Sequence, residues 1–191
     1  MNLYVSKTQI MWKEIAIIFF AIFSVRVAID LYVFLSYKKF VKKFFANQWN
    51  GLEEKIDKIL KTASVFANGP FNKSNRIRYN DLCVIQASIA YMRDDEELFV
   101  NQLAKAKEEN SYEATSFILA LYYHSKANET KAKECFERYL SCNRENKNLQ
   151  IIMNFLFKQD EKVSTEELNE AIRFVKNPAV LKLLKENNLA Q

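Results

Sequence analysis

The longest run of apolar positions lies near the start of the chain, at residues 15–37. Its first 21 residues would reach about 30 Å as an α-helix, which is the thickness of the hydrocarbon core of a bilayer. A helix is expected there because lipid offers no hydrogen-bond partner to an open backbone. The pattern therefore predicts a transmembrane helix, preceded by a short outer segment at residues 1–14. Aromatic side chains suited to the two membrane interfaces stand at its ends: Trp12, Tyr32 and Tyr37.

Two charges, Arg26 and Asp30, interrupt this run. Each costs about 2.5–3.5 kcal/mol near the bilayer centre on insertion scales. Their i,i+4 spacing puts both on one helix face, so they are a candidate intramembrane pair. Three interpretations stay open: a pair that satisfies itself, with Asp30 near the interface if the span is shifted; a pair that faces another transmembrane helix, such as a second copy in a homo-oligomer; or a soluble, buried helix. A cleaved signal peptide is disfavoured because the basic residues follow the run.

Basic residues cluster directly after the predicted span: Lys38, Lys39, Lys42 and Lys43. The positive-inside bias predicts a single-pass protein of the cell membrane with its C-terminal part in the cytoplasm. Anionic lipid headgroups attract such a cluster by about 1 kcal/mol per basic residue. Aromatic residues interleave with the lysines, so residues 38–50 fit either an amphipathic helix lying on the membrane surface or a plain extension of the span.

From residue 51 onward the apolar residues recur at helical spacing, and no strand-like alternation competes. The only glycines, Gly51 and Gly69, stand at borders between segments, which favours long helices and few tight turns. After a first helix and a polar connector at residues 71–80, the pattern predicts paired helices and a terminal helix, with Asn128, Ser164 and Asn177 as N-caps. The predicted helices are 52–66, 82–94, 96–108, 112–126, 129–142, 147–158, 165–176 and 178–187.

Equivalent residues of successive predicted pairs recur every 32 positions: Tyr91, Tyr123 and Phe155 in the first helices, and Ala104, Phe136 and Leu168 in the second. In the middle pair, the large-small pair Leu119-Ala120 precedes Tyr123, and Ala132 precedes Phe136. Small residues at 120 and 132 would let the two helices approach closely. These positions and spacings resemble the tetratricopeptide repeat over residues 81–176. Elsewhere the match is looser, with Val100 and Ser164 at expected small positions and no terminal proline in any unit.

The resemblance implies an all-α fold: a single N-terminal transmembrane helix followed by a tetratricopeptide-like solenoid of helical hairpins over residues 51–191. In that family the first helices line a concave surface that binds extended peptides or partner helices. The resemblance therefore implies a candidate partner-binding groove formed by Ile89, Met92, Arg93, Phe117, Leu121, His124 and Met153. The clamp of lysines and asparagines found in chaperone-binding members is absent.

The charge of the chain, +5, is concentrated next to the membrane. From Phe44 onward 21 basic residues meet 21 acidic ones, which leaves no basic footprint for nucleic acid. The three cysteines, Cys83, Cys135 and Cys142, form no metal-binding spacing and fit reduced thiols in a cytosolic domain. The abundance of Lys, Asn, Ile and Phe is typical of a bacterial genome rich in A and T.

No pattern of catalytic residues stands out. His124 is the only histidine and is expected on the surface. The acidic run at residues 94–97 precedes a predicted helix, where carboxylates are favoured by the positive helix N-terminus. We therefore expect no enzyme and no cofactor.

The sequence predicts a membrane-anchored adaptor or scaffold that binds a protein or peptide at the cytoplasmic face of the membrane. Two alternatives stay open. One is a small membrane immunity or accessory protein that acts through its transmembrane helix. The other is a receptor-like protein of the mitochondrial outer membrane, which would have the same topology.

Overall fold

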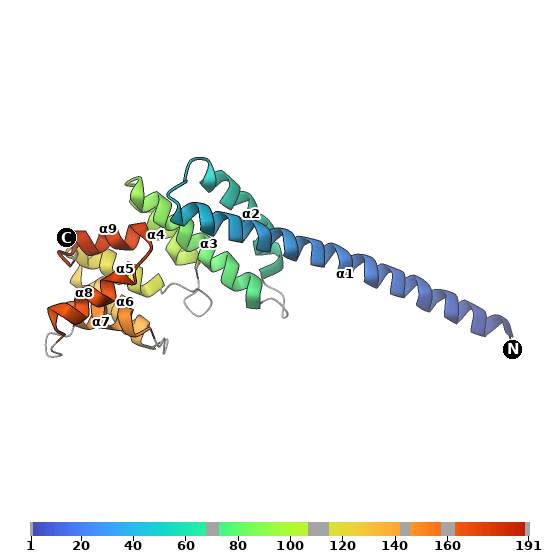
Figure 1. Cartoon of the computed structure of the whole chain (residues 1–191). Coiled ribbons are helices and arrows are strands. Elements are labelled where there is room, and N and C mark those ends of the chain that lie inside the picture. The colour runs from blue at the N-terminus through green and yellow to red at the C-terminus, as the bar shows by residue number, and fades with distance from the viewer. Residues whose placement is uncertain (1, 68–72, 107–114, 142–145, 158–162, 190–191) are drawn as a thin grey trace.

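The computed structural model describes residues 2–67, 73–106, 115–141, 146–157 and 163–189, and within them every regular element is a helix. The prediction of an all-α protein is therefore confirmed for these residues. A long helix, α1, projects from a bundle of shorter helices that holds the C-terminus (Figure 1). The helices are α1 (Asn2–Phe45), α2 (Leu52–Ala67), α3 (Lys73–Met92), α4 (Glu96–Lys105), α5 (Thr115–Ser125), α6 (Glu129–Ser141), α7 (Lys147–Phe157), α8 (Thr165–Arg173) and α9 (Pro178–Glu186).

The helix α1 runs without a break from Asn2 to Phe45, across the predicted borders between the segments 1–14, 15–37 and 38–50. Its first part stands free of the bundle, and its last part lies on α2 and α3 (Figure 1). It ends after Phe45, where Asn47 and Gly51 both adopt positive φ angles, 55° and 64°. Glycine takes this conformation at no steric cost, so the chain reverses there into α2.

The centre of the bundle is α3, which is buried at every position from Asn80 to Tyr91. It packs against α1, α2, α4 and α9. Two polar side chains on this buried stretch form hydrogen bonds to residues outside α3. The Gln86 Nε2 atom donates to Asp57 Oδ1 on α2 at 2.7 Å, and Asn177 Nδ2 donates to Ser88 Oγ at 3.0 Å.

Consecutive helices make the most extensive contacts, in the pairs α5 with α6, α3 with α4, α2 with α3, and α7 with α8. The predicted small residues at the contact of α5 with α6, Ala120 and Ala132, are fully buried. The predicted N-caps are present. Ser164 and Glu167 form a capping box, Asn177 caps α9 ahead of Pro178, and Asn128 Oδ1 accepts from the backbone of α6. The tetratricopeptide-like arrangement of these pairs stays a prediction.

An aromatic cluster joins α3, α4 and α5. The ring centroid of Phe99 lies 4.7 Å from that of Tyr91 and 5.1 Å from that of Tyr122. The predicted 32-residue repeat aligned Tyr123, rather than Tyr122, with Tyr91. In the structure Tyr122 is buried in this cluster, whereas Tyr123 is half-buried. One residue turns a side chain by about 100° around a helix, so two adjacent tyrosines cannot both face the core. The third member of the predicted series, Phe155, is exposed.

Candidate functional site

The free part of α1 presents apolar side chains on all of its sides. From Met11 to Val27 its large apolar residues are about half exposed or more, with Phe19 and Phe20 both at 68%. Exposing so large a continuous apolar surface to water is unfavourable. A surface of this kind is typical of a contact with a membrane or with another protein. The helix is long and apolar enough to cross a membrane.

The second part of α1 is held to α3 by polar contacts. The Asn75 Nδ2 atom donates to Asp30 Oδ1 at 2.5 Å, and the Tyr37 hydroxyl donates to Asp81 Oδ2 at 3.0 Å. The Arg78 guanidinium donates to Asn75 Oδ1 at 2.7 Å and stacks over the Phe34 ring. Because residues 30 and 37 meet residues 75 and 81 in the same order, the two helices run parallel.

These contacts change two sequence predictions. The connector predicted at residues 71–80 is helical from Lys73 onward, and its polar side chains are what bind α1. Asp30 makes its hydrogen bond to Asn75, and no ion pair joins it to Arg26 among the described residues. The i,i+4 spacing allows an ion pair, but the Asp30 carboxylate instead accepts a hydrogen bond from the Asn75 amide on α3.

Two of the aromatic residues in the segment predicted at residues 38–50 face the helical bundle. Phe40 and Phe44 are buried in the protein core, at 6% and 1% exposure. Trp49 Nε1 donates to the Phe44 carbonyl at 3.0 Å and the two rings stack. The alternative of a plain helix extension therefore agrees with the structure. Three of its lysines, Lys38, Lys39 and Lys42, are exposed, and Lys43 is half-buried.

The predicted concave groove is filled. Four of its seven residues are fully buried in the core: Ile89, Phe117, Leu121 and Met153. Met92 is half-buried, and the exposed Arg93 forms an ion pair with Glu53. His124 is half-buried, with its Nδ1 atom 2.6 Å from Asn187 Oδ1.

The element that fills the groove is α9, which packs on α3 and α5. Four of its side chains, Ala179, Val180, Leu183 and Leu184, are buried. The terminal helix was predicted from the sequence, but the surface that it covers was not.

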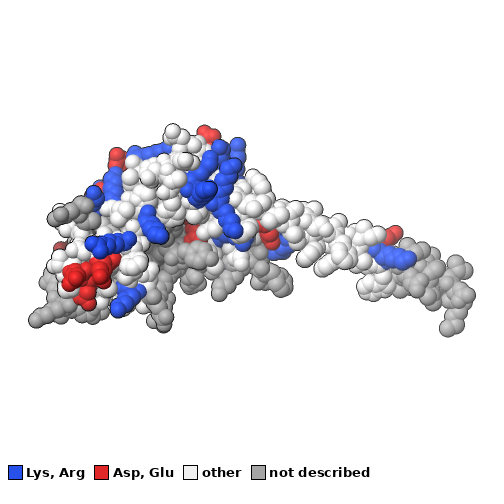
Figure 2. Space-filling model, viewed as in Figure 1, with Lys and Arg blue, Asp and Glu red and all other residues white. Residues whose placement is uncertain are grey.

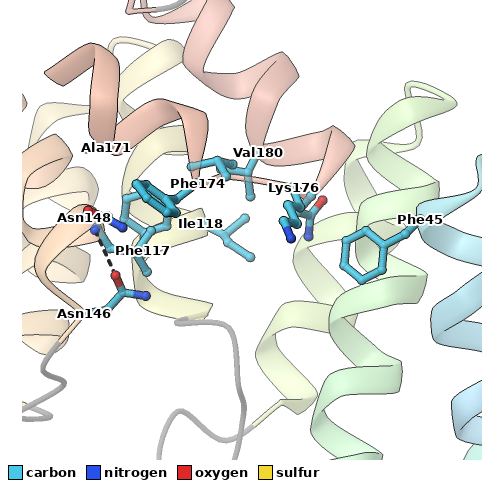
Figure 3. Close-up of a pocket in the computed structure, with 12 residues that line it drawn as sticks. Phe45, Phe117, Ile118, Asn146, Asn148, Ala171, Phe174, Lys176 and Val180 are labelled. Carbon is cyan, nitrogen blue, oxygen red and sulfur yellow. Dashed lines mark hydrogen bonds between the residues drawn. The ribbon is translucent and has the colours of Figure 1, made fainter. Parts of the chain in front are cut away.

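An apolar pocket of about 280 Å³ lies between α5, α7 and the link from α8 to α9. Figure 3 shows Phe174 and Ile118 at this space, with Phe45 reaching toward it from the end of α1. Phe174 is 68% exposed and Phe45 is 46% exposed, whereas Phe117 and Ile118 form a buried floor. The rim is polar, and Asn146 uses its Oδ1 atom to cap α7 at the Leu149 N–H, 3.3 Å away. Phe117 was among the residues of the predicted groove, but no pattern in the sequence predicted this pocket.

A polar cluster ties the end of α9 to the rest of the bundle. Lys182 Nζ lies 2.6 Å from Asp94 Oδ1 and donates to the Tyr91 carbonyl at 3.2 Å. The Tyr91 hydroxyl donates to Glu186. Burial, and then this carboxylate, raise the pKa of Tyr91. The Lys182 ammonium lowers the pKa of Asp94.

A second group of the same cluster links α4 to α5. Lys126 pairs with Glu96, and the Tyr122 hydroxyl donates to Glu96 Oε2 at 2.9 Å. These two donors lower the pKa of Glu96, while burial and the carboxylate raise the pKa of Tyr122 to about 12. Another acid of the run, Asp95, caps α4 by accepting a hydrogen bond from the Leu98 N–H. The acidic run therefore meets a helix N-terminus and two lysines.

Reactive groups are scarce in the part of the chain that the structure describes. Cys83 is buried, and desolvation raises the pKa of its thiol to about 11, which keeps it protonated at neutral pH. Cys135 is half-buried, and Cys142 lies outside the described residues. No group of three or more His, Cys, Asp or Glu residues could hold a metal ion among the residues searched.

Comparison with known proteins finds no matching family model, no matching curated protein and no matching solved structure. Among the described residues, two exposed apolar surfaces bear on function: the free part of α1 and the pocket beside Phe174.

Proposed function

We propose that this chain is a membrane-anchored adaptor. In this proposal the free part of α1 crosses a bilayer, and the helical bundle binds a protein at the cytoplasmic face. The observation that carries the proposal is the all-round exposure of the apolar residues between Met11 and Val27. A core helix of a soluble protein would be mostly covered, but only 6% of the most apolar window of this helix is buried.

The length of the free surface supports the same proposal. From Met11 to Ile29 a helix reaches about 28 Å, which is close to the hydrocarbon thickness of a bilayer. Lys13 and Glu14 lie at the outer end, where side chains reach the interface. The exposed lysines that follow favour a cytoplasmic bundle under the positive-inside rule.

The partner surface proposed here is the pocket beside Phe174, in place of the filled groove. Its volume of about 280 Å³ is near the lower end of the range for ligand sites, so it suits one or two apolar side chains of a peptide or helix. Its polar rim, formed by Asn146, Asn148 and Lys176, can hydrogen-bond a peptide backbone. An exposed aromatic side chain at such a mouth is typical of the residues that dominate binding energy.

Two measurements test the proposal. After a high-pH wash that strips peripheral proteins, we expect the full chain to stay in the membrane pellet. In the same membranes, a photoreactive phenylalanine analogue at Phe174 should crosslink to a protein partner. The matched control is the analogue at Phe155, another exposed phenylalanine that does not line the pocket.

The outcomes separate the two parts of the proposal. A chain that leaves the membrane during the wash would refute the anchor. A chain that stays but gives the same crosslinks at both positions would refute the pocket. Protease digestion of the bundle only after the membrane is opened would confirm a cytoplasmic side.

One observation favours the alternative in which function resides in the span. Arg26 lies in the apolar helix without an ion pair in the described residues, because Asn75 binds Asp30. An unpaired charge at such a place is a candidate contact with another helix. If two copies associate there, Arg26→Gln should abolish a crosslinked dimer in membranes, and unchanged dimer would refute this alternative.

A further inference from the structure

One side of α1 stays exposed after the helix has joined the bundle, and we call it the open face. Its first side chains are apolar, since Leu31, Tyr32 and Leu35 are 54%, 55% and 56% exposed. The next exposed positions along the helix are lysines: Lys38, Lys39 and Lys42. These residues recur at intervals of three and four, so they lie on one side of the helix. The open face therefore changes from apolar to basic between residues 35 and 38.

The opposite side of α1, which we call the bundle face, changes earlier. It carries the only two charges between residues 15 and 37, Arg26 and Asp30. Asp30 accepts a hydrogen bond from Asn75 of α3 at 2.5 Å, and Val33, on the same face, is 1% exposed. On the open face the apolar side chains continue to Leu35, about 7.5 Å further along the axis than Asp30.

The two faces differ in the same sense at the outer end of the helix. Eighteen residues make five full turns, so positions 18 apart share a face. Lys13 and Glu14, both exposed, thus lie on the open face, 18 positions before its first two apolar residues. Trp12 lies on the bundle face, 18 positions before Asp30, and suits a membrane interface. The apolar band covers residues 15–35 on the open face and 12–29 on the bundle face, so it is displaced toward the bundle at both ends of the open face.

We propose that α1 crosses the bilayer obliquely and leans its open face onto the membrane. In this arrangement Leu31, Tyr32 and Leu35 lie among the acyl chains, and the lysines that follow lie at the headgroups. A flat slab that cuts a helix obliquely displaces the apolar band on one face in this way. An offset of about 7.5 Å across a helix about 10 Å wide corresponds to a tilt of about 35°, within the range of about 0–40° for transmembrane helices. This inference rests on the proposed anchoring, but it assigns a lipid-facing side to the bundle end of α1, which an upright anchor would not have.

The charges at this level fit an oblique boundary. Figure 2 shows the projecting part of α1 as mostly white, with charged side chains near its outer end and again where it joins the bundle. Phe34 is half-buried at the edge between the two faces, and Lys38 Nζ lies 4.4 Å from its ring centroid. The Arg78 guanidinium of α3 stacks over the same ring at 4.8 Å. Positive charge therefore stands between the level of Asp30 and the level where the open face becomes basic. The three lysines of the open face form no ion pair among the described residues, so they can attract anionic headgroups.

The test compares the access of water to three engineered cysteines. The full chain is placed in lipid nanodiscs of phosphatidylcholine and phosphatidylglycerol, one copy in each disc, and treated with a water-soluble maleimide. The reagent needs a thiolate, which forms in water and not among acyl chains. Peptide mass spectrometry reads each site, so the native cysteines do not interfere. We expect Leu35→Cys to react at least about 10-fold more slowly than Ser74→Cys. Because α3 runs parallel to α1, the exposed Ser74 lies at the level of Asp30, nearer the middle of the span than Leu35.

The order of the two rates decides between the arrangements. An upright α1 would place Leu35 further into water than Ser74, so equal rates or a faster Leu35→Cys would overturn the proposal. Phe45→Cys is the matched control, since Phe45 is exposed about 15 Å beyond Leu35 and should react as fast as Ser74→Cys. Slow reaction at all three positions would also overturn the proposal, because the whole end of the bundle would then be embedded. Rates measured after denaturation in urea correct for differences between the thiols. Failure of the anchor itself is read separately, from the high-pH wash of wild-type membranes.

Discussion

The two parts of α1 are both rich in large apolar side chains, yet their surroundings are opposite. Phe20, in the first part, is 68% exposed, whereas Phe44, in the second part, is 1% exposed. The boundary between them is marked by Asp30, the first side chain of α1 that hydrogen-bonds to α3 in the described residues. Hydrophobicity alone therefore does not distinguish an exposed turn of α1 from a buried one. The position of polar residues that hydrogen-bond to another helix does distinguish them.

The largest expected effect is on the buried part of α1. Phe44→Ala should lower the free energy of unfolding of the bundle by about 3–5 kcal/mol, because it removes a fully buried aromatic side chain. Chemical denaturation of the full chain in detergent measures this loss. The neighbouring Phe45→Ala is the control, since Phe45 is 46% exposed and should cost about 1 kcal/mol or less. Equal losses would mean that the end of α1 is not docked as described.

The next effect concerns the free part of α1 and should leave the bundle intact. Phe20→Asp should disfavour membrane insertion by about 2.5–3.5 kcal/mol, because a carboxylate would enter the hydrocarbon. The fraction of the chain that survives a high-pH wash measures insertion, and Phe20→Leu should behave as the wild type. A fall in the melting temperature of the bundle in Phe20→Asp would show that this residue touches protein.

A smaller effect is expected at the boundary itself. Asn75→Ala should lower the free energy of unfolding by about 1–3 kcal/mol, because Asp30 and Arg78 each lose a hydrogen-bond partner in a partly buried place. Ser74→Ala, at the adjacent exposed position, is the matched control and should change little. If the two variants are equally stable, the contact between Asp30 and Asn75 does not hold α1 to α3.

The smallest effect lies far from α1, in the polar cluster beside α9. The pKa values of Asp94 and Glu96 are lowered in the folded chain, so their stabilising contribution is present above their unfolded pKa values and is lost as the pH falls through the folded ones. Stability should therefore be constant from neutral pH to about pH 5 and should decline below about pH 4.5. Exposed ion pairs contribute little, so the decline should be shallow.

Lys126→Gln tests the cause of that decline. Without this lysine Glu96 loses one of its two donors and keeps only Tyr122, so the melting temperature should fall less steeply between pH 5 and pH 3. Lys133→Gln removes the same charge from an exposed position on α6 and should keep the slope of the wild type. Parallel slopes in the two variants would contradict the ion pair.

Local patterns predicted much of the helical framework. The breaks at the N-caps Ser164 and Asn177 follow from hydrogen bonds between residues only two or three positions apart, so the sequence shows both partners at once. The bounds of several later helices, such as α6, were predicted to within a residue or two because apolar spacing repeats within each helix, whereas α3 begins nine residues before the predicted start. The free part of α1 was found for the same reason.

The candidate sites were predicted less well. Asn75 and Arg78 were assigned to a connector because nothing near them in the sequence binds them, whereas their partners are Asp30 and Phe34 on another helix. Ile89 and Leu121 were assigned to an open groove because a first helix of a repeat often lines one. The cover that buries them, α9, comes from the end of the chain.

By itself the sequence determined that this protein is helical, where most helices begin and end, and that one helix is apolar enough to cross a membrane. Those properties depend on contacts within a few residues and on the total cost of exposing apolar surface. Only the tertiary structure decided which face of α1 is covered, which helix fills the groove and which pocket stays open. These depend on pairs of residues tens of positions apart, such as Asp30 with Asn75 and Ser88 with Asn177, whose proximity exists only after the helices pack.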